Sequence, residues 1–154
     1  MPSNPAGLIY GTISVAALLA AESARQENYP RTVGAVVITI CLYWLAHSYS
    51  QFTGERVKEH VAFTYAGLLK TAREELSVIV GAAGPLLVLV ICWVAGASLV
   101  AAVIAAIWTS AGVVIVLEIV IGIRAELTGR ELVRQTVVGA ILGLLVIALR
   151  VLLH

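Results

Sequence analysis

Charged residues are scarce in this 154-residue chain: Asp, Glu, Lys and Arg together make up 12% of it, and apolar residues make up 60%. A water-facing domain usually carries about 25% charged residues, so the composition indicates an integral membrane protein. The net charge is only +1, and its ten basic residues are dispersed, which leaves no basic surface for nucleic acid. The expected partners are therefore membrane lipid and other membrane-embedded chains.

Residues that bind metals and cofactors are also few. The two cysteines, Cys41 and Cys92, lie in apolar runs without His or Cys at metal-ligand spacing, and we interpret them as buried thiols. A haem held between helices usually needs two ligands from His or Met, whereas the apolar runs contain only His47. No hydrolase or metalloprotease motif is present. We expect no metal, no cofactor and no enzymatic activity, hence no catalytic residue.

Long apolar runs separate the charged clusters, and a bilayer core of about 30 Å needs about 20 helical residues. The runs predict an all-α fold, a polytopic transmembrane bundle in which residues 1–154 form one domain. The five predicted spans are residues 6–21, 32–52, 77–95, 99–123 and 135–153. A four-span alternative leaves the first segment on the membrane surface. That segment lacks the basic start of a signal peptide, so we interpret it as a span.

Local signals locate the turns within this plan. A single helix over residues 77–123 would measure about 70 Å, so the chain must reverse, and the turn is predicted at Gly96 to Ser98. Pro85 is expected to kink the third span. Thr128 and Glu131 fit a capping box, which predicts a helix start just before the last span.

The connection 53–76 has apolar residues every three or four positions among charged ones, which predicts a cytoplasmic amphipathic helix. This helix is expected either to lie along the inner headgroups or to pack against another subunit. Basic residues gather in two connections, 53–76 and 124–134. The positive-inside rule therefore predicts a cytoplasmic N-terminus and an external C-terminus. The composition is typical of small bacterial proteins of the inner membrane.

Small residues at four-residue spacing allow helices to approach closely in lipid. Gly7 and Gly11 form one such pair in the first span, and Gly139 and Gly143 form another in the last. The two pairs predict either packing within the bundle or a contact between chains.

Ionisable residues at membrane depth are costly unless they meet a partner or water. His47 and Glu118 are the two candidates, and both are expected toward the inner leaflet, where a carboxylate beside an imidazole can hold or relay a proton. The structural alternatives place Glu118 at the inner interface and His47 in an aromatic belt with Trp44. Two functions remain open: an oligomeric channel or transporter for protons or a small ion, and a non-catalytic subunit of a larger membrane complex.

Overall fold

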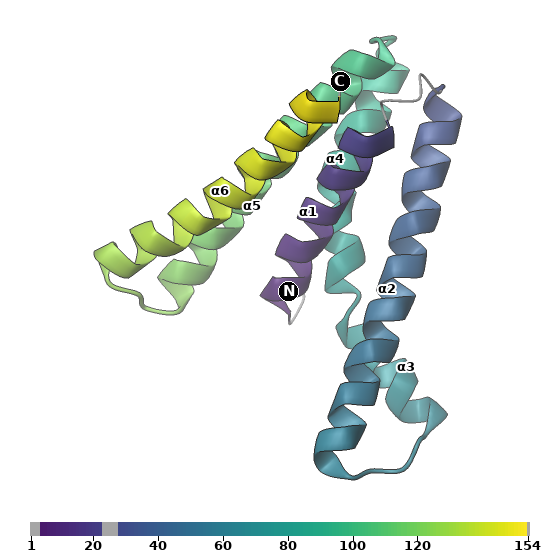
Figure 1. The fold of residues 1–154 in the computed structure, drawn as a ribbon, viewed down its shortest axis with the longest axis vertical. Helices are drawn as coiled ribbons and strands as arrows, with labels where there is room; N and C mark the ends of the chain where they lie inside the picture. Colours follow the sequence, from purple (N-terminus) through teal and green to yellow (C-terminus); the bar gives the residue numbers. More distant parts are fainter. Residues whose placement is uncertain (1–3, 23–27, 154) are drawn as a thin grey trace.

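The computed structural model describes residues 4–22 and 28–153, and all regular secondary structure in these two ranges is helical. The predicted all-α fold is therefore confirmed for the described chain (Figure 1). The helices are α1 (Pro5–Glu22), α2 (Tyr29–Glu59), α3 (Tyr65–Glu74), α4 (Ser77–Val94), α5 (Leu99–Arg124) and α6 (Gly129–Leu153).

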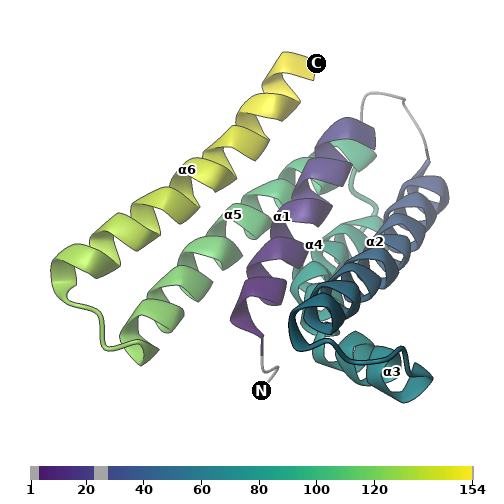
Figure 2. The same ribbon diagram turned by 60° about the horizontal axis from the view of Figure 1, so that its bottom comes forward.

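Helix α1 lies in the middle of the bundle and contacts α2, α4, α5 and α6, most extensively α4 (Figure 2). The long helices run alternately up and down, so the N-terminus, the α2–α3 connection and the α5–α6 turn lie toward one end of the bundle (Figure 1). The α4–α5 turn and the C-terminus lie at the other end. This alternation is the arrangement that a chain crossing a membrane repeatedly requires.

Apolar side chains cover the outside of this bundle. Three helical segments of the described chain are long and apolar enough to cross a membrane: Tyr29–Glu59, Tyr65–Val94 and Leu99–Arg124, the second comprising α3 and α4 together. Between 22% and 33% of the most apolar window in each is buried inside the bundle. Pro5–Ala21 is a shorter apolar helix. A soluble protein rarely exposes large apolar patches, so this surface suits contact with lipid.

Cys41 shows the same pattern in a single residue. It is a free thiol and is exposed on the surface of α2, whereas Cys92, also free, is partly buried. The prediction of a buried thiol is therefore wrong for Cys41. The physical reason is that a small apolar side chain needs burial only against water, and lipid imposes no such demand.

Asn and Ser side chains mark several helix starts. The Asn4 side-chain oxygen accepts a hydrogen bond from the Gly7 amide at 3.2 Å, directly before the proline that opens α1. Asn28 accepts in the same way from the Arg31 amide at 3.2 Å, and Ser98 caps α5. These caps satisfy amide groups that a helix start leaves without an intrahelical partner.

The connection 53–76 is not one helix. Helix α2 continues to Glu59, His60 adopts a left-handed conformation with φ of 55°, and the chain reverses before α3. Thr64 begins α3 by accepting a hydrogen bond from the Gly67 amide at 3.2 Å. The apolar spacing along this segment thus crosses a turn, because a helix stop followed by a new N-cap outweighs continuous periodicity.

The other predicted boundaries lie close to the observed ones. Helices α4 and α5 are separated at the predicted turn, where Gly96 has a φ of 75° that residues with a Cβ rarely adopt. Pro85 lies inside α4 and is buried. Helix α6 begins at the predicted capping box, where Glu131 accepts hydrogen bonds from the Thr128 hydroxyl at 2.8 Å and the Thr128 amide at 3.0 Å. These two bonds favour the ionised carboxylate and lower the pKa of Glu131.

Close contact between α1 and α4 holds the centre of the bundle. A Cβ built on Gly11 would collide with the backbone carbonyl of Val78, and one built on Gly81 would collide with the carbonyl of Leu8. The buried Thr12 hydroxyl lies 2.9 Å from the Gly81 carbonyl oxygen, to which it donates across the two helices. Glycine on both sides therefore allows the backbones to touch.

The remaining glycines of the two predicted pairs also face helices of the same chain. Gly7 lies against Ser77 at the start of α4. Gly139 faces the side chain of Glu118 on α5, and Gly143 faces Ala111 of the same helix. All four glycines therefore lie at contacts within one bundle, which is one of the two roles that their spacing predicts.

Candidate functional site

A short break between α3 and α4 positions a carboxylate inside the bundle. Helix α3 ends at Glu74 and α4 begins at Ser77, so Glu75 and Leu76 join two helices that follow almost directly on one another. The Glu75 amide still donates to the Thr71 carbonyl at 3.0 Å, which keeps the joint ordered. Glu75 is only 8% exposed, whereas the neighbouring Leu76 is exposed. The break thus turns an acidic side chain inward and an apolar one outward.

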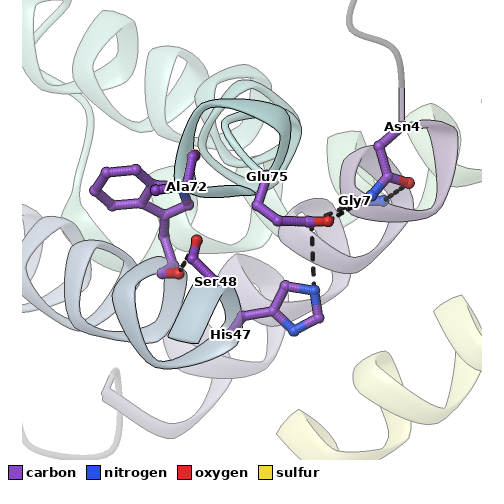
Figure 3. A network of polar contacts seen from close by, with 7 residues as sticks. Asn4, Gly7, His47, Ser48, Ala72 and Glu75 are labelled. Carbon is purple, nitrogen blue, oxygen red and sulfur yellow. Dashed lines mark hydrogen bonds and ion pairs between the residues drawn. The ribbon is translucent and has the colours of Figure 1, made fainter. Parts of the chain in front are cut away.

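Two other segments of the chain supply the partners of this carboxylate (Figure 3). The side-chain amide of Asn4, just before α1, donates to both Glu75 oxygens, at 3.1 Å to Oε1 and 3.2 Å to Oε2. His47 of α2 places its Nε2 3.4 Å from Glu75 Oε2. Asn4, His47 and Glu75, which we call the Glu75 cluster, therefore join three segments that are distant in the sequence.

The Glu75 cluster can bind a proton in more than one way. With the proton on imidazole, His47 and Glu75 form an ion pair; with the proton on the carboxyl group, both side chains are neutral. The 3.4 Å between His47 Nε2 and Glu75 Oε2 therefore allows one proton to be shared between the two side chains.

Aromatic side chains fix the position of His47. The rings of Tyr10 and Tyr43 lie near the imidazole, with centroids 5.6 Å and 6.4 Å from it, and lie 4.9 Å from one another. The indole N–H of Trp44 donates to the Ala72 carbonyl at 3.0 Å, one helical turn before Glu75. These contacts hold α2 against α1 and α3 at the height of the carboxylate. Tyr43 and Trp44 thus engage neighbouring helices.

One buried polar atom beside the Glu75 cluster has no partner. Among the described residues that are not exposed, the hydroxyl of Ser77 is the only buried side-chain oxygen or nitrogen without a hydrogen bond. Ser77 lies against Gly7, whose amide Asn4 caps. An unsatisfied hydroxyl in an apolar setting costs about 1–3 kcal/mol, so the first turns of α1 and α4 meet at a locally unfavourable point.

Glu118 occupies a different part of the bundle. Its carboxylate accepts a hydrogen bond of 2.6 Å from the Gln135 side-chain amide of α6. Helix α1 lies between α5, which carries Glu118, and α2, which carries His47, in both ribbon views (Figures 1 and 2). The expected meeting of His47 with Glu118 is thus replaced by two separate pairs, His47 with Glu75 and Glu118 with Gln135.

Glu75 and Asn4 are the functional candidates that the sequence pattern missed. The apolar spacing through residues 53–76 counts Glu75 among the charged positions, but in α3 the buried positions are Thr71 and Ala72, followed by Glu75 one turn later. The available signal was the sequence Asn4-Pro5, which is favourable for starting a helix.

Three hydroxyl groups on α2 and α5 are satisfied within their own helices. Ser48, Thr109 and Ser110 each donate to a carbonyl one turn earlier in their own helix. A void between α1, α5 and α6, lined in part by Ser110 and Gly143, has a volume of about 10 Å³. That volume is at or below what one water molecule needs.

Comparison with known proteins finds no match to this chain among protein-family models, curated sequences or solved structures.

Proposed function

We propose that this chain is a multi-pass membrane protein that moves protons, or a small ion coupled to protons, across the bilayer. Glu75 is the proton-binding group, His47 is its exchange partner, and Asn4 holds the carboxylate. The observation that carries the proposal is the burial of Glu75 at a helix break, with partners from two other segments. The protein contributes no covalent chemistry to this activity.

Helix lengths and aromatic positions support a five-span arrangement. Helix α2 has 31 residues and is about 46 Å long, while α1 has 18 and measures about 27 Å. Tyr29 stacks on Trp93 at one end of the bundle, with ring centroids 5.6 Å apart. Tyr49 follows Tyr29 along α2 by about 30 Å, the thickness of a bilayer core. On this placement the Glu75 cluster lies near the inner membrane boundary.

The charge distribution supports an orientation for these spans. The α2–α3 hairpin and the α5–α6 turn carry most of the basic residues and lie at the same end of the bundle (Figure 1). We propose that this end faces the cytoplasm of a bacterium, with the N-terminus inside and the C-terminus outside. Helix α3 then serves as an amphipathic element at the inner surface, with Lys70 and Glu74 exposed and Thr71 buried.

Energetic considerations favour a functional role for the Glu75 cluster over a purely stabilising one. An ion pair with a buried carboxylate is often no more stable than apolar side chains of similar volume. Since α1, α2 and α4 already pack through apolar residues and glycine, stability alone does not require a carboxylate at their inner end.

Transport through this bundle requires a path longer than the Glu75 cluster itself. The void between α1, α5 and α6 is too small for a hydrated ion. We propose that a homo-oligomer or a movement between helices supplies the rest of the path, with Glu118 and its partner Gln135 as a second polar position at α5 and α6.

A second candidate function is that of an accessory subunit in a larger membrane complex. The end of the α2–α3 hairpin favours it, because Val57, Val61 and Tyr65 are highly exposed beyond the proposed membrane boundary. Isolation of the chain from native membranes as a homogeneous homo-oligomer, with no other protein bound, would exclude this function.

The proposed function is tested by replacing Glu75 with glutamine. The protein is reconstituted in liposomes that contain a pH-sensitive dye, and a potassium diffusion potential drives proton entry. We expect Glu75→Gln to reduce proton flux by about ten-fold or more, because glutamine keeps the shape of the side chain but binds no proton.

The matched control is Glu74→Gln, since Glu74 is the neighbouring carboxylate but is half exposed and pairs with Lys70 at 3.8 Å. It should leave flux close to that of the unmodified protein. Equal flux in the two variants, or no flux above empty liposomes with the unmodified protein, would refute the role of Glu75.

A further inference from the structure

Asn4 contacts both the Glu75 carboxylate and the start of α1. Its side-chain oxygen accepts the hydrogen bond from the Gly7 amide, and its side-chain nitrogen donates to both oxygens of Glu75. The amide oxygen and nitrogen can be assigned to these positions because only the oxygen accepts and only the nitrogen donates. The side-chain amide of Asn4 is thus held by Glu75 through its nitrogen and by Gly7 through its oxygen.

The bonds from Asn4 depend on the charge of Glu75. An ionised carboxylate accepts through both oxygens and forms strong, charge-assisted hydrogen bonds. Protonation converts one of these oxygens into a hydroxyl group, so the Asn4 amide loses one of its two good acceptors. The two hydrogen bonds from Asn4 are therefore strongest when Glu75 is ionised.

The side-chain oxygen of Asn4 is linked, through Gly7, to the contact between α1 and α4. Gly7, which Asn4 caps, lies against Ser77 in the first turn of α4. A shift of the Asn4 side chain therefore reaches the contact between the first turns of α1 and α4, close to the Ser77 hydroxyl that lacks a partner.

From these contacts we infer that Asn4 is a positioning residue that sets the pH at which the Glu75 cluster takes up its proton and links that event to the first turn of α1. This inference deepens the proposed function and depends on Glu75 being the proton-binding group. Asn4 itself neither gains nor loses a proton in this exchange.

The chain offers a matched control in Asn28. It begins α2 as Asn4 begins α1, accepting from the amide three residues later at the same 3.2 Å, but it is exposed at the opposite end of the bundle. Asp caps helices about as well as Asn, so Asn→Asp preserves the cap at both positions. Only at Asn4 does it also remove a donor to Glu75 and add a like charge.

The test measures protonation directly by infrared spectroscopy in lipid nanodiscs over a range of pH. The carbonyl band of protonated Glu75 is identified by its loss in Glu75→Gln. We expect Asn4→Asp to move the midpoint of this band about one to two pH units higher, and Asn28→Asp to leave it unchanged. Asn4→Ser, which keeps a cap but adds no charge, should give a smaller shift in the same direction.

A midpoint that stays fixed in both Asn4 variants, or moves equally in Asn28→Asp, would overturn the inference. The outcome is distinct from the test of function. A shifted band without proton flux would leave Asn4 in its role and reject transport, whereas flux that depends on Glu75 with an unmoved midpoint would reject only the role of Asn4.

Discussion

Gly11→Ala should destabilise the folded bundle by about 1–3 kcal/mol, the cost of forcing extra volume into a packed contact. The added methyl group would collide with the backbone carbonyl of Val78, which cannot rotate away as a side chain can. Helices α1 and α4 would have to separate, and the hydrogen bond from Thr12 to the Gly81 carbonyl would lengthen or break. Reversible unfolding in mixed micelles, followed by tryptophan fluorescence, measures the change.

Gly112→Ala provides the control for this substitution. Gly112 is also inside a helix, but a Cβ built there meets no atom within 4 Å. Alanine stabilises a helix interior by about 0.5–1 kcal/mol relative to glycine, so this variant should be as stable as the original or slightly more stable. Equal destabilisation by both variants would show that α1 and α4 do not touch as described.

The second large effect is expected from replacing the proton-binding pair with apolar residues, His47→Phe together with Glu75→Met. Phenylalanine keeps a ring beside Tyr10 and Tyr43, and methionine matches the unbranched shape of glutamate. We expect stability within about 1 kcal/mol of the original and proton flux no higher than in empty liposomes. The combination of intact folding with lost transport distinguishes a functional cluster from a structural one.

The single variants provide a further test of this prediction. His47→Phe alone leaves the buried carboxylate with Asn4 as its remaining partner, which should cost about 1–3 kcal/mol. The two substitutions should therefore be less harmful together than the sum of their separate effects. A double variant that unfolds, or one that still conducts protons, would contradict the assignment.

Boundaries marked by local chemistry were predictable from the sequence. The reversal at Gly96 follows from run length and a residue that tolerates positive φ, and the start of α6 follows from Thr128 and Glu131. The end of α2 at His60 was not predicted, because the apolar spacing around it does not indicate a residue in the left-handed conformation.

The Glu75 cluster depends on packing between distant segments, which one sequence does not reveal. Asn4 and Glu75 are 71 residues apart, and they meet only because α1 packs on the start of α4. The sequence predicts a depth along a span for both His47 and Glu118. It does not say on which side of α1 each residue lies, and that decides their partners.

Proton transport by the Glu75 cluster requires that these helices cross a bilayer. The high cost of its buried carboxylate depends on the same arrangement. Labelling of single cysteines in sealed vesicles of known orientation tests this directly, after Cys41 and Cys92 are replaced by alanine. Ala62→Cys, Ala95→Cys and Ala125→Cys each place a thiol at an exposed position between helices. An impermeant maleimide should reach positions 62 and 125 only from the cytoplasmic face and position 95 only from the opposite face. Reaction of position 95 from the same face as the other two would contradict the membrane arrangement.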